Sequence, residues 1–177
     1  MTLTTNGKLD PRICSVALDA NALDKDGGAR DALVDRLLSL MKAGEIKFVQ
    51  PNTARKQTLH PNTPSAVRGV MTAQIFTLPT ELTPDEQTRR REVLIVMRGN
   101  STTNRHDADA DIIFDAAKYG GYLITEDRRI LDNRAKLEKI IRLPLCIVSL
   151  ADFLALYDKF RDEEYEREKL MALYRRK

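Results

Sequence analysis

Residues 106–131 read HDADADIIFDAAKYGGYLITEDRRIL. Apolar residues follow Asp109 at the spacing of one helical face: Ile112, Ile113, Ala116 and Ala117. Asp109 lies on that same face, in the first turn. Gly120 and Gly121 are expected to end the helix, since glycine tolerates the left-handed conformation at a helix C-terminus. The apolar run 122–125 then predicts a buried strand, with Asp127 just beyond it. One carboxylate thus lies on the core side of a helix and another at the end of the next strand.

Strands and helices alternate along the rest of the chain. Buried strands are predicted at the short apolar runs 13–18, 46–49, 122–125 and 145–148. Helices besides the one after Asp109 are predicted at 30–43, 52–59, 64–75, 84–98, 130–141 and 150–177. Thr83 and Glu86 have the spacing of a capping box at the start of one of these helices. This order predicts an α/β fold, a three-layer α/β/α sandwich around a short, mainly parallel sheet.

Composition indicates a soluble globular chain. Its 177 residues carry a net charge of +3, with 42% hydrophobic and 31% charged residues, which suits a domain large enough to bury a core. No apolar run approaches the ~20 residues of a membrane helix, and the N-terminus lacks a signal-peptide core. We therefore expect a cytoplasmic protein that does not contact a membrane. Cys14 and Cys146 lie in apolar runs, which favours buried free thiols.

Three acidic residues are placed to form one site. Asp19 and Asp127 each follow a strand, and Asp109 begins the helix that leads into the second of those strands. Ligands of open parallel sheets bind at the carboxyl ends of the strands, so we expect the three carboxylates to lie together. Clustered carboxylates repel unless a cation lies between them, and oxygen ligands suit Mg²⁺ or Mn²⁺. Such ions can activate a water and stabilise a leaving oxygen, which predicts metal-dependent hydrolysis of phosphodiesters.

Taken singly, these acids also have structural interpretations. Asp19 can be a turn residue after a strand, and Asp127 can favour the dipole of the following helix. Three neighbouring acids are interpreted as structural, with Asp107 as a helix cap and the other two facing solvent: Asp111 and Asp115. The combination of three acids at one sheet edge favours the site.

Three short motifs resemble the PIN domain, a fold of metal-dependent nucleases that includes many toxin ribonucleases of toxin–antitoxin pairs. They are LDANAL at 18–23, Asp109-x-x-Ile112-Ile113-x-x-Ala116, and LITED at 123–127. The eighteen-residue spacing between Asp109 and Asp127 is similar to the family pattern. The resemblance implies a single PIN-like domain over 1–177, with its core at about 13–155 and a C-terminal helical extension at 156–177.

The resemblance also implies which residues act. The catalytic and metal-binding acids would be Asp19, Asp109 and Asp127. Asn21 matches a small polar residue two places after the first acid, and Thr125 matches the polar residue before the last one. The family usually carries a glutamate on the helix after the second strand, whereas this chain has Gln57 in that slot. A glutamine contributes no charge, so it would lower metal affinity and could reduce turnover.

A nucleic-acid substrate, RNA rather than DNA, is the expected partner. Basic side chains near the predicted site could hold its phosphates: Arg55, Lys56, Arg68, Arg128 and Arg129. An antitoxin-like protein and a homodimer are further expected partners. His60 and His106 are interpreted as loop residues, although His106 can approach the site because it lies three residues before Asp109.

Other functions stay open at this point. The first alternative is a PIN-like domain that is catalytically impaired at Gln57 and binds nucleic acid or a protein partner. A phosphotransfer domain of the receiver type would need a lysine directly after the strand 145–148, where none stands. A haloacid-dehalogenase-like phosphatase would need an aspartate two residues after Asp19, where the chain has Asn21. These two departures favour the nuclease.

Overall fold

The fold is built on one parallel sheet. A computed structural model describes residues 9–52, 69, 81–101 and 106–174, except for the side chains of 170 and 172–174. Its strands are β1 (Ser15–Leu18), β2 (Lys47–Val49), β3 (Tyr122–Ile124) and β4 (Cys146–Val148). They lie in the order β2-β1-β3-β4, and every pair is parallel. Since β1 is central, the residues that follow it lie in the middle of the carboxyl edge.

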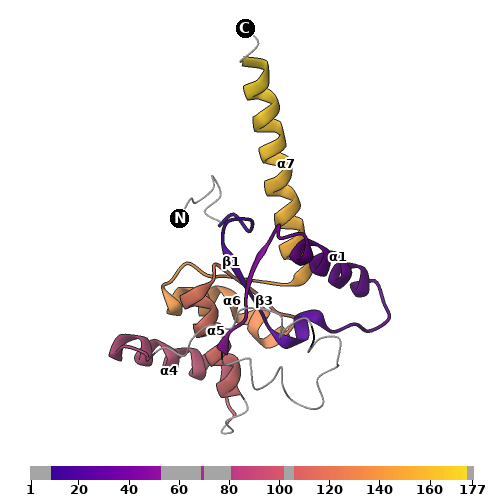
Figure 1. The fold of residues 1–177 in the computed structure, drawn as a ribbon. Helices are drawn as coiled ribbons and strands as arrows, with labels where there is room; N and C mark the ends of the chain where they lie inside the picture. The colour runs from indigo at the N-terminus through magenta and orange to yellow at the C-terminus, as the bar shows by residue number, and fades with distance from the viewer. Residues whose placement is uncertain (1–8, 53–68, 70–80, 102–105, 175–177) are drawn as a thin grey trace.

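Helices cover both faces of the sheet (Figure 1). One face is covered by α1 (Arg30–Lys42) and α7 (Leu150–Tyr174). The other face is covered by three helices: α4 (Pro84–Arg98), α5 (Asp107–Tyr119) and α6 (Arg128–Ile141). A short 3-10 helix, η1 (Ala20–Leu23), follows β1. The predicted three-layer α/β/α sandwich is therefore confirmed.

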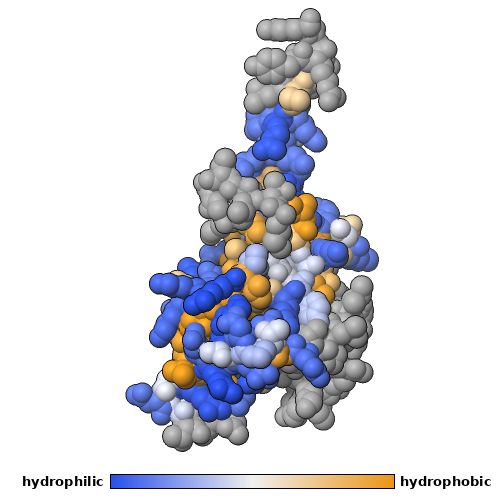
Figure 2. All heavy atoms as spheres, turned by 90° about the vertical axis from the view of Figure 1, so that its left-hand side faces the viewer, coloured by the Kyte–Doolittle hydropathy of each residue, from blue (hydrophilic) through white to orange (hydrophobic). Residues whose placement is uncertain are grey.

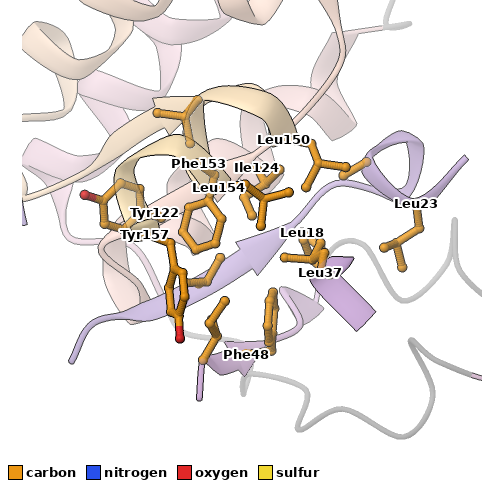
Figure 3. Packing of buried hydrophobic residues seen from close by; sticks show 14 of the residues in the cluster. Leu18, Leu23, Leu37, Phe48, Tyr122, Ile124, Leu150, Phe153, Leu154 and Tyr157 are labelled. Carbon is orange, nitrogen blue, oxygen red and sulfur yellow. The ribbon is translucent and has the colours of Figure 1, made fainter. Parts of the chain in front are cut away.

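The sheet is buried on both faces, as its continuous apolar runs predict. Leu18, Phe48 and Ile124 project from three neighbouring strands toward α1 and α7 (Figure 3). On the same side, the Tyr122 and Phe153 rings pack edge to face with centroids 5.5 Å apart. Ala17, Leu123 and Ile147 point the other way, into the core beneath α4, α5 and α6. Alternate residues of each short strand thus serve two separate cores.

The predicted helical face of α5 is confirmed. Its four apolar residues are all buried: Ile112, Ile113, Ala116 and Ala117. The predicted left-handed ending is wrong, because Gly120 has φ −123° and ψ 177°, which is extended backbone. These glycines are needed because neighbouring atoms pack against them too closely for a side chain. A Cβ on Gly121 would lie 2.8 Å from Leu9 Cδ1 and 2.9 Å from Cys14 Cβ, so β3 can enter the sheet only without that side chain.

Capping residues mark the starts of α4, α6 and α7 within about two residues of the predicted positions. Thr83 and Glu86 form the predicted capping box at the start of α4. The Ser149 hydroxyl accepts the Asp152 N–H at the start of α7. The helix predicted from 130 begins at Arg128, because Asp127 is its N-cap. The strand predicted from 13 begins at Ser15, since Ile13 is 60% exposed.

The acids interpreted as structural have partners that the sequence did not indicate. Asp111 was expected to face solvent but pairs with Arg90 of α4, with Nε and Oδ1 2.5 Å apart. Asp107 was expected to cap α5 but pairs with Arg98, and the α5 N-cap is His106. Both ion pairs attach the start of α5 to α4, which sequence spacing within a single helix cannot reveal.

The long helix α7 continues beyond the sheet and projects from the body of the molecule (Figure 1). The face seen in Figure 2 is mostly hydrophilic along the described part of this projection. No helix in the described residues is long and apolar enough to cross a membrane. Cys14 is buried and Cys146 is partly buried, and neither forms a disulfide. The helices predicted at 52–59 and 64–75 lie outside the described residues, apart from positions 52 and 69.

Candidate active site at the carboxyl edge of the sheet

Asp19 is the buried acid of the site. It follows β1 directly, and its backbone N–H donates to the Ile124 carbonyl of β3 at 3.0 Å, which extends the sheet pairing by one residue. The residue is only 8% exposed. Its Oδ2 accepts a hydrogen bond from the Thr125 hydroxyl at 2.8 Å. A carboxylate is therefore held beneath the surface at the carboxyl ends of the two central strands.

Thr125 connects two of the predicted site acids. Its Oγ1 accepts the Asp127 N–H at 3.1 Å and lies 2.8 Å from Asp19 Oδ2. Asn21 Oδ1 is also within 3.5 Å of the same hydroxyl. A hydroxyl has one hydrogen to donate, and the shorter contact to the carboxylate is the one that it forms. The hydroxyl thus orients Asp19 while it ties the start of α6 to β1.

The electrostatics of Asp19 disfavour its ionised form. The pKa of Asp19 is raised to about 6 from an ordinary value of 3.8, and burial is the largest cause. The negative charges of Asp109 and Asp127 also raise this pKa, while hydrogen bonds from Thr125 and the Ala20 backbone lower it. Both other acids therefore act on Asp19 through space. A carboxylate such as Asp19, with further negative charges near it, attracts a proton or a cation.

Asp127 has a structural task as the N-cap of α6. Its Oδ1 accepts the backbone N–H groups of Arg129 at 2.7 Å and Ile130 at 3.4 Å. The second oxygen, Oδ2, accepts no hydrogen bond from any residue in the described part of the chain. Asp127 can therefore cap α6 and also take part in the site, because capping uses Oδ1 and leaves Oδ2 for a ligand.

Asp109 lies in the first turn of α5, with its side chain 24% exposed. Its Oδ2 lies 3.2 Å from Nδ1 of His106. His106 is only 9% exposed and contacts Asp109, as its position three residues before this acid predicted. Its second contact, from Nε2 to Arg129, joins the start of α5 to the start of α6.

The oxygen donors at this edge suit Mg²⁺ or Mn²⁺. Within residues 9–52, 69, 81–101 and 106–174, no three Asp, Glu, His or Cys side chains converge closely enough to hold a metal ion. Mg²⁺ keeps several water ligands and binds through one or two carboxylates, so a buried Asp19 with neighbouring Asp109 and Asp127 charges fits its chemistry. The predicted three-carboxylate metal site stays a prediction.

Two amides lie close to Asp19. Asn21, which was expected to support the site, accepts the Glu126 N–H through Oδ1 at 3.0 Å and so fixes the loop that carries Asp127. Gln50 was not predicted. It follows β2 directly, is 1% exposed, and points its Nε2 at the Leu18 carbonyl at 3.5 Å. The sequence could have indicated Gln50, because it is a polar residue directly after a strand, as Asp19 is.

The predicted basic residues are placed unequally. Arg128 and Arg129 are both exposed residues on the first turn of α6. Arg129 directs its Nη1 to the Met97 carbonyl at 2.8 Å and to His106 Nε2 at 2.7 Å. The other predicted residues lie outside the described part of the chain: Arg55, Lys56, Gln57, His60 and Arg68. Because the Arg129 guanidinium is engaged by the Met97 carbonyl and His106, Arg128 is the better placed of the two arginines to contact a phosphate.

Comparisons of this chain with protein-family models, curated proteins and solved structures found no match.

Proposed function

We propose that this protein is a Mg²⁺- or Mn²⁺-dependent nuclease that hydrolyses phosphodiester bonds, with RNA as its preferred substrate. The observation that carries the proposal is the buried Asp19 carboxylate at the carboxyl edge, whose pKa is raised by burial and by the charges of Asp109 and Asp127. Ionising Asp19 beside the other two acids is unfavourable without a cation. The motifs that resemble the PIN domain support the same chemistry, since their three acids are these residues.

In the proposed reaction, one or two of the acids Asp19, Asp109 and Asp127 would bind the metal directly, and the remaining carboxylate would act through the water ligands of the metal. A bound Mg²⁺ or Mn²⁺ would supply an activated water and stabilise the leaving oxygen of the phosphodiester. Thr125 keeps the Asp19 carboxylate in one orientation through its hydroxyl. Asn21 and the capping oxygen of Asp127 hold the loop between β3 and α6. These bonds fix the position of Asp127 relative to Asp19. Arg128 would contact the phosphate backbone without reading sequence.

Cleavage assays test the proposal directly. Labelled RNA and DNA strands are incubated with the full chain in millimolar Mn²⁺, in Mg²⁺ and in chelator. We expect metal-dependent cleavage of RNA by the wild type and at least a ~100-fold loss in Asp19→Asn, because the buried ligand loses its charge. Asp132→Asn is the matched control, since Asp132 is an exposed acid of α6 outside the site. Equal metal-dependent rates in wild type and Asp19→Asn would overturn the proposal.

A second candidate function is a PIN-like domain that binds nucleic acid without cleaving it. The neutral Gln57, at the position where the family usually carries a glutamate, favours this candidate. The Gln57→Glu variant separates the two. Cleavage by Gln57→Glu together with binding but no cleavage by the wild type would support the binding domain. Cleavage by both proteins, faster in the variant, would support the nuclease, because the added carboxylate strengthens a site that already works.

A further inference from the structure

A chain of three side chains leads from α6 to the predicted metal ligand Asp109. His106, at the start of α5, is 9% exposed. Its Nδ1 lies 3.2 Å from Asp109 Oδ2, and its Nε2 lies 2.7 Å from Arg129 Nη1. Arg129 belongs to the first turn of α6, one residue beyond Arg128. The imidazole therefore lies between a cation on one helix and a carboxylate on another.

The chemistry of arginine decides which nitrogen of His106 carries the proton. A guanidinium has only donors, so Nε2 must be the acceptor and must lack a hydrogen. Neutral imidazole then has its hydrogen on Nδ1, where it is donated to the Asp109 carboxylate. The same Arg129 nitrogen also donates to the Met97 carbonyl at 2.8 Å, and an NH₂ group has the two hydrogens that both bonds need. Arg129 is thereby anchored to the C-terminal end of α4.

We propose that Arg129 and His106 are positioning residues for Asp109. Arg129 holds the ring in the Nδ1–H form, and the ring holds Oδ2 of the carboxylate. The other oxygen, Oδ1, accepts no hydrogen bond from any residue in the described part of the chain and is the one that would bind the cation. This inference rests on the proposed function, because Asp109 is a metal ligand only there. Residues that orient a ligating carboxylate typically change metal affinity ~10–100-fold when they are mutated.

The proposal reverses one expectation from the sequence. Arg128 and Arg129 are adjacent basic residues, and both were expected to contact nucleic acid. Here Arg129 acts on the metal ligand through His106, whereas the exposed Arg128 stays available to a phosphate. Arg128→Ala is therefore a matched control for Arg129→Ala, with the same change in charge at a neighbouring position.

Mn²⁺ affinity, measured by calorimetry on the full chain, tests the positioning role. Asparagine places an amide donor near the position of Nδ1, whereas glutamine places its amide near that of Nε2. We therefore expect His106→Asn to bind Mn²⁺ within about threefold of the wild type, and His106→Gln and Arg129→Ala to lose ~10–100-fold. Arg128→Ala should keep wild-type affinity. Unchanged affinity in both His106→Gln and Arg129→Ala, or an equal loss in Arg128→Ala, would overturn the proposal.

The tautomer is tested separately, without metal. Two-bond ¹H–¹⁵N spectra of the wild-type imidazoles near neutral pH distinguish the Nδ1–H form from the Nε2–H form, and His60→Ala identifies the His106 signals. We expect the Nδ1–H form for His106 in the wild type and a shift toward Nε2–H in Arg129→Ala. An Nε2–H or doubly protonated ring in the wild type would overturn the arrangement, even if variants failed to fold. A wild type with the Nδ1–H form that binds no Mn²⁺ would instead refute the proposed function and, with it, the positioning role.

Discussion

The Thr125 hydroxyl donates to Asp19 Oδ2 at 2.8 Å and accepts the Asp127 N–H at 3.1 Å. One small side chain thereby joins the residue after β1 to the N-cap of α6. Because Thr125 is fully buried, neither bond is exchanged with water. The geometry of two site acids thus depends on a residue that carries no charge itself.

Replacing that hydroxyl should destabilise the fold. We expect Thr125→Val to lower the free energy of unfolding by about 1–3 kcal/mol, because it leaves the Asp19 carboxylate and the Asp127 N–H without their partner in a buried place. Thr125→Ser keeps the hydroxyl and should lose less. Urea unfolding of the three proteins measures the difference. Equal stability of wild type and Thr125→Val would contradict the interpretation.

Asp19 should make the metal-free protein less stable as the pH rises. Its pKa is raised from 3.8 to about 6 on folding, so its stabilising contribution is complete below pH 3.8 and is lost as pH rises through about 6. That difference in pKa corresponds to about 3 kcal/mol.

Asp19→Asn tests this linkage, because an amide stays neutral at every pH. We expect a gain in unfolding free energy of about 1–2 kcal/mol near pH 7.5, which is less than the full linkage energy because the amide replaces one acceptor oxygen with a donor. The gain should vanish near pH 4, where the wild-type carboxyl is protonated. Urea titrations at both pH values give the result, and a loss of stability near pH 7.5 would refute the interpretation.

Divalent metal should stabilise the protein more strongly at higher pH. A ligand must be deprotonated before it binds a metal, and Asp19 is largely protonated below pH 6. We therefore expect a larger rise in melting temperature with millimolar Mn²⁺ near pH 7.5 than near pH 5. Asp132→Asn should behave like the wild type, whereas Asp19→Asn should lose most of the response. A metal-induced shift that is the same at both pH values would argue against Asp19 as a ligand.

The outer edge of β4 is protected by a side chain of α6. Glu138 Oε1 accepts the backbone N–H of Ile147 at 2.7 Å, the position that a further strand would occupy. An unprotected edge strand is a template for pairing with another chain. We expect Glu138→Ala to self-associate with rising concentration in light scattering coupled to size exclusion, while Glu138→Gln, which keeps a carbonyl acceptor, should elute as the wild type does. Identical elution of Glu138→Ala and Glu138→Gln at all concentrations would show that the edge needs no such protection.

Much of the fold followed from local signals. The spacing of apolar residues after Asp109 located the buried face of α5, and the Thr83–Glu86 capping box located the start of α4. The placement of Asp19 directly after a strand put it at the carboxyl edge, where the structure has it. Helix faces, caps and strand ends depend on neighbours within a few residues, so sequence spacing contains them.

The remaining features depend on contacts between segments that are distant in the chain. Gly121 is required because Leu9 and Cys14 pack against it, and a glycine pair gives no sign of what lies beside it. Arg128 and Arg129 are both exposed, and only the packed helices decide that Arg129 contacts His106 and the Met97 carbonyl. His106 acquires its tautomer from Arg129, 23 residues away. The sequence by itself determined that Asp19 follows a central strand and reaches the carboxyl edge of the sheet. The tertiary structure decided how Asp19 is held and why its pKa is raised, because burial and the partners of a charge are set only when distant segments pack together.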